Sequence, residues 1–265
     1  MNKRTLIISS GVTMTVLMSC CTVTPPAGER PTRDAQGAGR HLFILSGQSN
    51  MTGSVKAGFT QRVQERYGAE NAVVVISSRG GRGIRFWVED YRQHGDRGLT
   101  PKKMTSNGEE YTRLIKTVMD TVKDESFDTV GFIWMQGESD ANNRLSEVYE
   151  ESFVKLVERL KKDMDRDDLY FVIGRINDYA RSRPDNEHWH RVRESQVRLG
   201  NTSGNAWIDT DDLNGGDAKQ PNGDIHFPRE GAVSLGQRFA DKAMELIDKQ
   251  IETDNHTGPS PLDMQ

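Results

Sequence analysis

A serine follows directly after an apolar segment, at a position that suits a nucleophile. Residues 41–46 (His-Leu-Phe-Ile-Leu-Ser) end at Gly47, which predicts a buried strand that leads into a tight turn. Such a turn places Ser49 at the carboxyl edge of the strand, where open α/β sheets bind their ligands. Ser49 is a nucleophile if a base reaches its hydroxyl, and otherwise it is an N-cap that opens a helix.

Two later segments carry possible partners for Ser49. Residues 132–140 are an apolar run that ends in the polar sequence Gln-Gly-Glu-Ser-Asp, and residues 222–227 (Asn-Gly-Asp-Ile-His-Phe) contain His226. Acyl transfer by serine requires an imidazole that accepts the proton of the hydroxyl. His226 is therefore the candidate base, and the alternative is a surface histidine without a catalytic role.

Residues 47–51, 136–140 and 222–227 together resemble the SGNH (GDSL-like) hydrolase superfamily. The similarity is strongest to its sialate O-acetylesterase-like and acetyl xylan esterase-like carbohydrate esterases, and it extends from about Arg40 to about Ile251. It implies a three-layer α/β/α fold with a flavodoxin-like parallel sheet of about five strands. It also implies a serine esterase that removes O-acetyl groups from sialate, xylan or a related glycan through an acetyl-serine intermediate, without a cofactor or a metal.

The carboxylate that orients His226 has two candidates. Asp224 lies two residues before His226, and in an extended loop side chains two apart point the same way. Much of the superfamily has its aspartate one position earlier, where this chain has Gly223. Some acetyl xylan esterase relatives use the glutamate that corresponds to Glu138, which is otherwise a structural carboxylate. We expect Asp224 to orient the base and rank Glu138 second.

Three groups are candidates to stabilise the oxyanion of the reaction. The first is the backbone N–H of Ser49. The second lies in residues 79–83 (Arg-Gly-Gly-Arg-Gly), which follow a predicted strand and allow close approach of backbone to a ligand. In this loop Gly81 best matches the glycine of the family. The third is the side-chain amide of Gln136, which stands where many relatives have asparagine.

Several side chains are expected to contact a sugar. Gln48 and Asn50 flank the candidate nucleophile, Trp87 can stack on a pyranose ring, and Arg82 can contact an acidic sugar. The arginines at 85, 175 and 193 are either further sugar contacts or members of surface ion pairs. The acidic residues at 209, 211 and 212 do not have the spacing of an EF-hand loop, so a capped turn is favoured over a calcium site.

The first residues predict export and lipid attachment. Lys3 and Arg4 precede an apolar-leaning stretch at 6–17 that is too short to span a membrane. Residues 17–20 (Leu-Met-Ser-Cys) resemble a bacterial lipobox, so we expect a signal peptide at 1–19 and a lipid on Cys20. The alternative is an ordinary secretory signal. Lipid attachment would place the protein in the bacterial cell envelope, facing the periplasm or the exterior, with contact to the membrane only through the lipid.

The remaining chain alternates between strand and helix signals. We expect a flexible tether at 20–39, one domain at 40–251 and a disordered tail at 252–265. The predicted strands after the first are 72–76, 130–135, 169–173 and 206–208, and the predicted helices are 111–119, 148–160, 188–199 and 232–251. This order predicts a parallel sheet with helices on both faces.

Charge and composition exclude some functions and leave others open. The net charge is −4 and lysine and arginine form no basic stripe, so nucleic-acid binding has no electrostatic support. Two alternatives to the carbohydrate esterase remain. One is a non-catalytic carbohydrate-binding lipoprotein, and the other is a short-chain lipid or aryl esterase, which the low apolarity of the chain disfavours.

Overall fold

The computed structural model describes residues 39–92, 106–123, 125–180, 186–215 and 223–256. The predicted signal peptide, Cys20 and all of the predicted tether except Gly39 lie outside these ranges. The fold below is therefore that of the predicted esterase domain.

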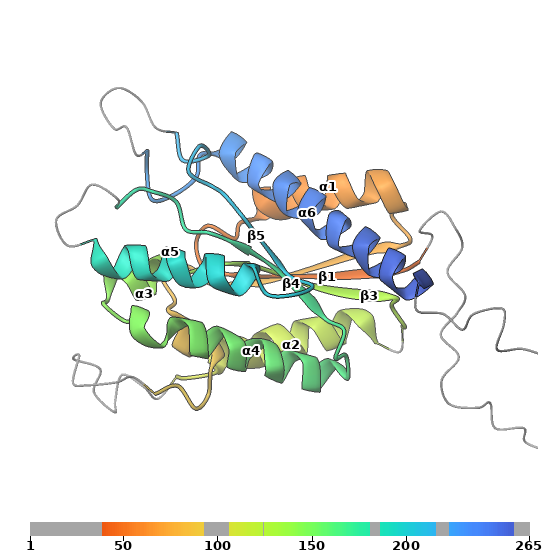
Figure 1. The fold of residues 1–265 in the computed structure, drawn as a ribbon, viewed down its shortest axis with the longest axis horizontal. Coiled ribbons are helices and arrows are strands. Elements are labelled where there is room, and N and C mark those ends of the chain that lie inside the picture. Colours follow the sequence, from red (N-terminus) through yellow and green to blue (C-terminus); the bar gives the residue numbers. More distant parts are fainter. Residues whose placement is uncertain (1–38, 93–105, 124, 181–185, 216–222, 257–265) are drawn as a thin grey trace, which may run out of the picture. The chain divides into compact units, whose positions relative to one another are not determined.

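The centre of the fold is a parallel sheet with the strand order β2-β1-β3-β4-β5 (Figure 1). The strands are β1 (His41–Gly47), β2 (Ala72–Ser78), β3 (Thr129–Met135), β4 (Tyr170–Gly174) and β5 (Ala206–Ile208). This is the flavodoxin-like order, so the predicted fold class is confirmed. Every residue of β1 and β3 is buried, which explains their continuous apolar runs.

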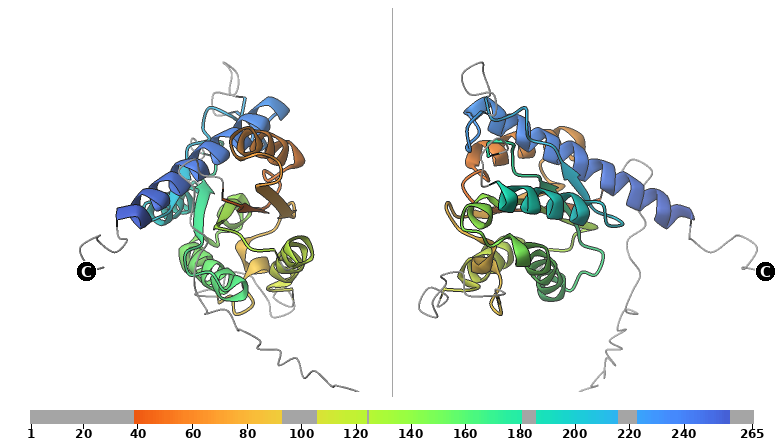
Figure 2. Two further views of the ribbon diagram at one scale, coloured as in Figure 1. Left: turned by 90° about the vertical axis from the view of Figure 1, so that its right-hand side faces the viewer. Right: turned by 60° about the vertical axis from the view of Figure 1, so that its left-hand side comes forward.

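Helices cover both faces of the sheet (Figures 1 and 2). One face carries α1 (Gly53–Tyr67) and α6 (Arg229–His256), and the other carries α2 (Glu109–Val122), α4 (Tyr149–Met164) and α5 (Glu187–Gly200). In the described parts of the connections lie the short helices η1 (Ile84–Trp87), α3 (Glu138–Asn142) and η3 (Ser146–Val148). Because α6 extends to His256, the predicted disorder from 252 is wrong for 252–256, and 257–265 lie outside the described residues.

Helix α1 is the one long described helix that the sequence pattern did not predict. It packs closely against α6 at two glycines. A Cβ on Gly58 would lie 2.3 Å from the carbonyl oxygen of Val233, and one on Gly236 would lie 2.1 Å from that of Val55. The two backbones therefore approach closely, and a contact of this kind leaves only a weak apolar periodicity in the sequence.

None of the helices in the described ranges combines the length and apolarity needed to cross a membrane.

Candidate active site

Ser49 and His226 lie together although 177 positions separate them in the chain. Ser49 occupies the turn after β1, and its Oγ is 3.0 Å from Nε2 of His226. The turn requires Gly47, since a Cβ there would lie 1.9 Å from the carbonyl oxygen of Met135. The N-cap of α1 is Thr52, whose Oγ1 accepts from the backbone of that helix, so the alternative that Ser49 opens the helix is wrong.

The glycine-rich loop after β2 lies beside Ser49. The backbone N–H of Arg79 donates to the carbonyl of Gly47 at 3.0 Å, and a Cβ on Gly80 would lie 3.7 Å from Cβ of Ser49. Gly81 has a φ of +70° and faces open space. Within the described part of the chain, the N–H groups of Ser49 and Gly81 donate to no acceptor. The described fold therefore leaves both N–H groups unused.

Gln136 does not have the position expected of an oxyanion donor. Its side chain is 0% exposed. Its Nε2 donates to the carboxylate of Asp140 at 2.5 Å, to the carbonyl of Arg82 at 3.1 Å and to Oε1 of Gln48 at 3.2 Å. The amide N–H groups are thus used inside the fold, and the bond to the carbonyl of Arg82 supports the glycine-rich loop.

Gln48 and Asn50 are buried, which contradicts the expectation that they contact substrate. Oε1 of Gln48 also accepts from the backbone N–H of Ser139 at 3.2 Å. Nδ2 of Asn50 donates to Oε1 of Glu138 at 2.6 Å. Because alternate residues of this turn face inward, both amides join the turn to the start of α3.

Trp87 is also in the core, and its expected stacking on a sugar is wrong for the same reason. It is 1% exposed, its Nε1 donates to Oγ of Ser46 at 3.2 Å, and its ring packs edge-on against Trp134. Arg82 remains partly exposed, and its guanidinium lies 3.3 Å from a carboxylate oxygen of Glu109 and over the ring of Phe86. Its contact with substrate stays a prediction.

Neither candidate carboxylate forms a hydrogen bond with the imidazole of His226 among the described residues. Asp224 is exposed, and its Oδ1 accepts from the backbone N–H of His226 at 3.2 Å, so it closes a short turn within the loop. Glu138 is buried and reaches this loop only through Asn50.

Gly223 stands where much of the superfamily has aspartate, and the backbone explains this difference. Its φ is +63°, and a Cβ would lie 2.4 Å from the carbonyl oxygen of Asn214. The next residue, Asp224, donates its N–H to that same carbonyl at 2.9 Å. The loop that carries His226 therefore begins with a turn that favours glycine.

Two buried carboxylic acids lie beneath the site. Burial raises the pKa of Glu138 to about 7, although the hydrogen bond from Asn50 opposes the rise. Burial also raises the pKa of Asp140 to about 6, against hydrogen bonds from Gln136 and from the backbone of Ile84. Asp140 had no predicted role. Its position four residues after Gln136, inside the short helix α3, is the signal that indicates their contact.

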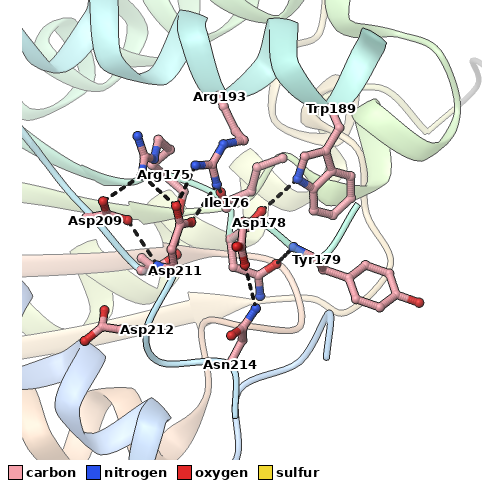
Figure 3. Close-up of polar contacts among 12 residues, drawn as sticks. Arg175, Ile176, Asp178, Tyr179, Trp189, Arg193, Asp209, Asp211, Asp212 and Asn214 are labelled. Atoms are coloured by element: carbon pink, nitrogen blue, oxygen red, sulfur yellow. Dashed lines mark hydrogen bonds and ion pairs between the residues drawn. The ribbon is translucent and has the colours of Figure 1, made fainter. Parts of the chain in front are cut away.

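A network of arginines and aspartates lies after β4 and β5 (Figure 3). Arg175 pairs with Asp209 at 2.7 Å and with Asp211 at 3.0 Å, and Arg193 pairs with Asp211 at 2.7 Å. Oδ1 of Asp209 accepts from the backbone N–H of Asp211, as a capped turn requires. No group suited to a metal ion occurs in the described ranges. The alternative that Arg175 and Arg193 form ion pairs therefore agrees with the structure.

Asn177 is a supporting residue that sequence reasoning missed. It is buried just after β4, and its Nδ2 donates to the carbonyl oxygens of Asp224 at 3.1 Å and Ile225 at 3.2 Å. A polar residue within three positions of the end of a buried strand was the available signal, as it was for Ser49.

Comparison with solved structures shows the same fold at low sequence identity. A protein from Arabidopsis thaliana is similar with a TM-score of 0.57 and 19% identity, over 78% of this chain and 98% of that chain. A carbohydrate acetylesterase from Xanthomonas citri is similar with a TM-score of 0.57 and 17% identity, over 77% of this chain and 56% of that chain. A comparison with curated proteins gives no match.

The family described as "carbohydrate esterase, sialic acid-specific acetylesterase" matches residues 54–245. This range includes Gln136, Glu138, Asp224 and His226 and begins five residues after Ser49. The match covers well over half of the chain. The protein therefore belongs to this family of carbohydrate esterases.

Proposed function

We propose that the protein removes O-acetyl groups from carbohydrate through an acetyl intermediate on Ser49. The observation that carries this proposal is the 3.0 Å contact between Oγ of Ser49 and Nε2 of His226, next to a glycine-rich loop with unused N–H groups. A nucleophile, a base and oxyanion donors at one sheet edge are the requirements of acyl transfer.

The reaction follows from these positions. Ser49 Oγ attacks the acetyl carbonyl carbon while its proton passes to Nε2 of His226. The N–H groups of Ser49 and Gly81 donate to the oxyanion that forms. His226 then gives the proton to the sugar oxygen as the ester bond breaks. Water attacks the acetyl-serine in the same way, and acetate leaves.

The surface supports a short acyl group rather than a long one. The large apolar side chains that the described residues expose are Met119 on α2 and Val154 on α4, and neither lies at the carboxyl edge of the sheet. A long acyl chain requires an apolar surface beside the nucleophile, because its burial supplies about 0.8 kcal/mol per CH₂. Acetate requires none.

The experiment compares acetate release from acetylated xylan, sialate and pectin with hydrolysis of p-nitrophenyl esters of increasing chain length. We expect a burst of p-nitrophenol from the acetyl ester, steady acetate release from at least one glycan, and a decline in rate with longer acyl chains. Ser49→Ala should abolish the burst and reduce turnover by several orders of magnitude while the circular dichroism spectrum stays that of the parent. Retained turnover in a folded Ser49→Ala protein would contradict the proposal.

A further inference from the structure

The loop that carries His226 has no regular structure of its own. Residues 223–228 belong to no helix or strand, and His226 is exposed. The distance from Ser49 Oγ to His226 Nε2 therefore depends on the hydrogen bonds that hold the loop backbone. Catalysis is sensitive to this distance, since a displacement of about 1 Å can cost about 10²-fold in rate.

Asn50 binds the loop on both sides of His226. Its Nδ2 donates to the carbonyl oxygen of Ile225 at 2.8 Å, and its Oδ1 accepts from the N–H of Phe227 at 3.3 Å. Asn50 is also the neighbour of Ser49 in the chain and is 2% exposed. One buried side chain thus connects the turn of the nucleophile to the two residues that flank the base.

Glu138 determines which way the amide of Asn50 points. A carboxamide has a donor side and an acceptor side, and only one orientation fits its surroundings. Glu138 Oε1 and the carbonyl of Ile225 are both acceptors, so the NH₂ group must face them. The oxygen of Asn50 is then left for the N–H of Phe227. In the reverse orientation the oxygen of Asn50 would face the two acceptors, and its NH₂ group would face the N–H of Phe227. All three hydrogen bonds would then be lost.

We propose that Asn50 is a positioning residue of the esterase and that its amide, oriented by Glu138, sets the distance between Ser49 and His226. This inference rests on the proposed function, because it assigns a role within the same site. It gives Glu138 a role that does not require contact with the imidazole. The carboxylate acts on the base through Asn50 and the loop backbone.

Asn177 also binds the loop that carries His226, and comparison with it shows how the role of Asn50 differs from support of the loop alone. Its Nδ2 donates to the carbonyls of Asp224 and Ile225, both on one side of His226. It follows β4, and among the described residues it forms no hydrogen bond with the turn of Ser49. Asn177 therefore holds the loop to the sheet, whereas Asn50 holds the base to the nucleophile.

The main test is Asn50→Asp, which preserves size and replaces the NH₂ group with an oxygen. That oxygen would face the carboxylate of Glu138 and the carbonyl of Ile225, so the loop should move away. With p-nitrophenyl acetate we expect kcat to fall by about 10²-fold while KM changes little. The matched control is Asn205→Asp, at the opposite edge of the sheet, where Oδ1 accepts from the N–H of Phe171. It should keep the kcat of the parent.

A rescue experiment separates positioning from general damage. In the double variant Asn50→Asp/Glu138→Gln, the amide introduced at position 138 donates to the carboxylate introduced at position 50. The donor and acceptor have then exchanged places, and we expect kcat to recover by about 10-fold over Asn50→Asp, as a strongly coupled pair should. A double variant that recovers thermal stability without kcat would overturn the proposal.

Folding does not limit the test, because Glu138→Gln alone preserves shape and replaces a buried ionisable group with a neutral amide. We expect it to lower kcat without raising KM, since its amide no longer forces one orientation on Asn50. A kcat like that of the parent in folded Asn50→Asp, or in Glu138→Gln if Asn50→Asp does not fold, would disprove the positioning role. Ser49→Ala tests the proposed function separately, because loss of the nucleophile should remove turnover wherever His226 lies.

Discussion

Two groups of carboxylates follow strands of the sheet, and they are stabilised in different ways. Glu138 and Asp140 on α3 are buried, bind amide and backbone donors, and form no ion pair with the described arginines and lysines. Asp209 and Asp211 follow β5 and pair with Arg175 and Arg193 (Figure 3), and the next residue, Asp212, pairs with Arg238. We call these the buried pair and the ion-paired group.

The pKa values of the buried pair and those of Asp209 and Asp212 move in opposite directions. Burial raises the pKa of both members of the buried pair. For Asp209, burial also acts to raise the pKa, but the backbone N–H of Asp211 and the charge of Arg175 outweigh it and hold the pKa below its usual value. The hydrogen bond from Arg238 lowers the pKa of Asp212.

The difference in pKa reflects what an amide and an arginine each contribute as partners of a carboxylate. An amide beside a carboxylate offers donors in one direction only and so fixes the orientation of neighbouring groups. An arginine supplies charge that compensates for burial and stabilises the fold. The buried pair binds Asn50, next to Ser49, and Gln136, whereas the ion-paired group follows β5 at the edge of the sheet. Three changes test this contrast, in addition to the variants of Ser49 and Asn50.

Removing Asp211 should have the largest effect on stability. Asp211→Ala leaves Arg193 and Arg175, whose side chains are 11% and 17% exposed, without their shared partner. Loss of one member of a buried ion pair costs about 3–5 kcal/mol, and the partial exposure places the expected value near 3 kcal/mol. Urea unfolding measures this loss of free energy. A loss below about 1 kcal/mol would mean that the ion-paired group does not stabilise the fold.

Glu138→Gln should change the pH dependence of stability. The folded protein holds the proton of Glu138 up to a pKa of about 7, whereas the usual value is 4.5. Its contribution to stability is therefore complete below about pH 4 and is lost as the pH rises through 7. The variant lacks this loss, so its free energy of unfolding relative to the parent should rise by on the order of 2 kcal/mol between pH 5 and 8. Parallel profiles for the two proteins would show that Glu138 is already ionised at pH 5.

Asp212→Ala should have the smallest effect. The side chains of Arg238 and Asp212 are 38% and 65% exposed, so solvent screens their pairing. Exposed ion pairs contribute about 0–1 kcal/mol. Unfolding in low salt and in 1 M salt should therefore give almost the same small difference from the parent. A cost like that of Asp211→Ala would remove the distinction between exposed and buried members of the group.

The sequence pattern by itself predicted a parallel sheet with helices on both faces and the residues that meet at its carboxyl edge, whereas the flavodoxin-like class came from the resemblance to a known family. Ser49, the glycine-rich loop and Gln136 each follow an apolar strand, and parallel strands end at a common edge. The pairing of Ser49 with His226 required the resemblance to a known family, because no periodicity relates positions 177 apart.

Only the tertiary structure decided which polar side chains face the solvent. Gln48, Asn50 and Gln136 follow strands as Ser49 does, yet they turn inward and bind one another, Glu138 or Asp140. Trp87 and α1 differ from expectation for a related reason, since burial and close backbone packing depend on segments distant in the chain. Hydrophobic pattern reports where a strand ends, whereas the direction of a polar side chain depends on the partners that the completed fold places around it.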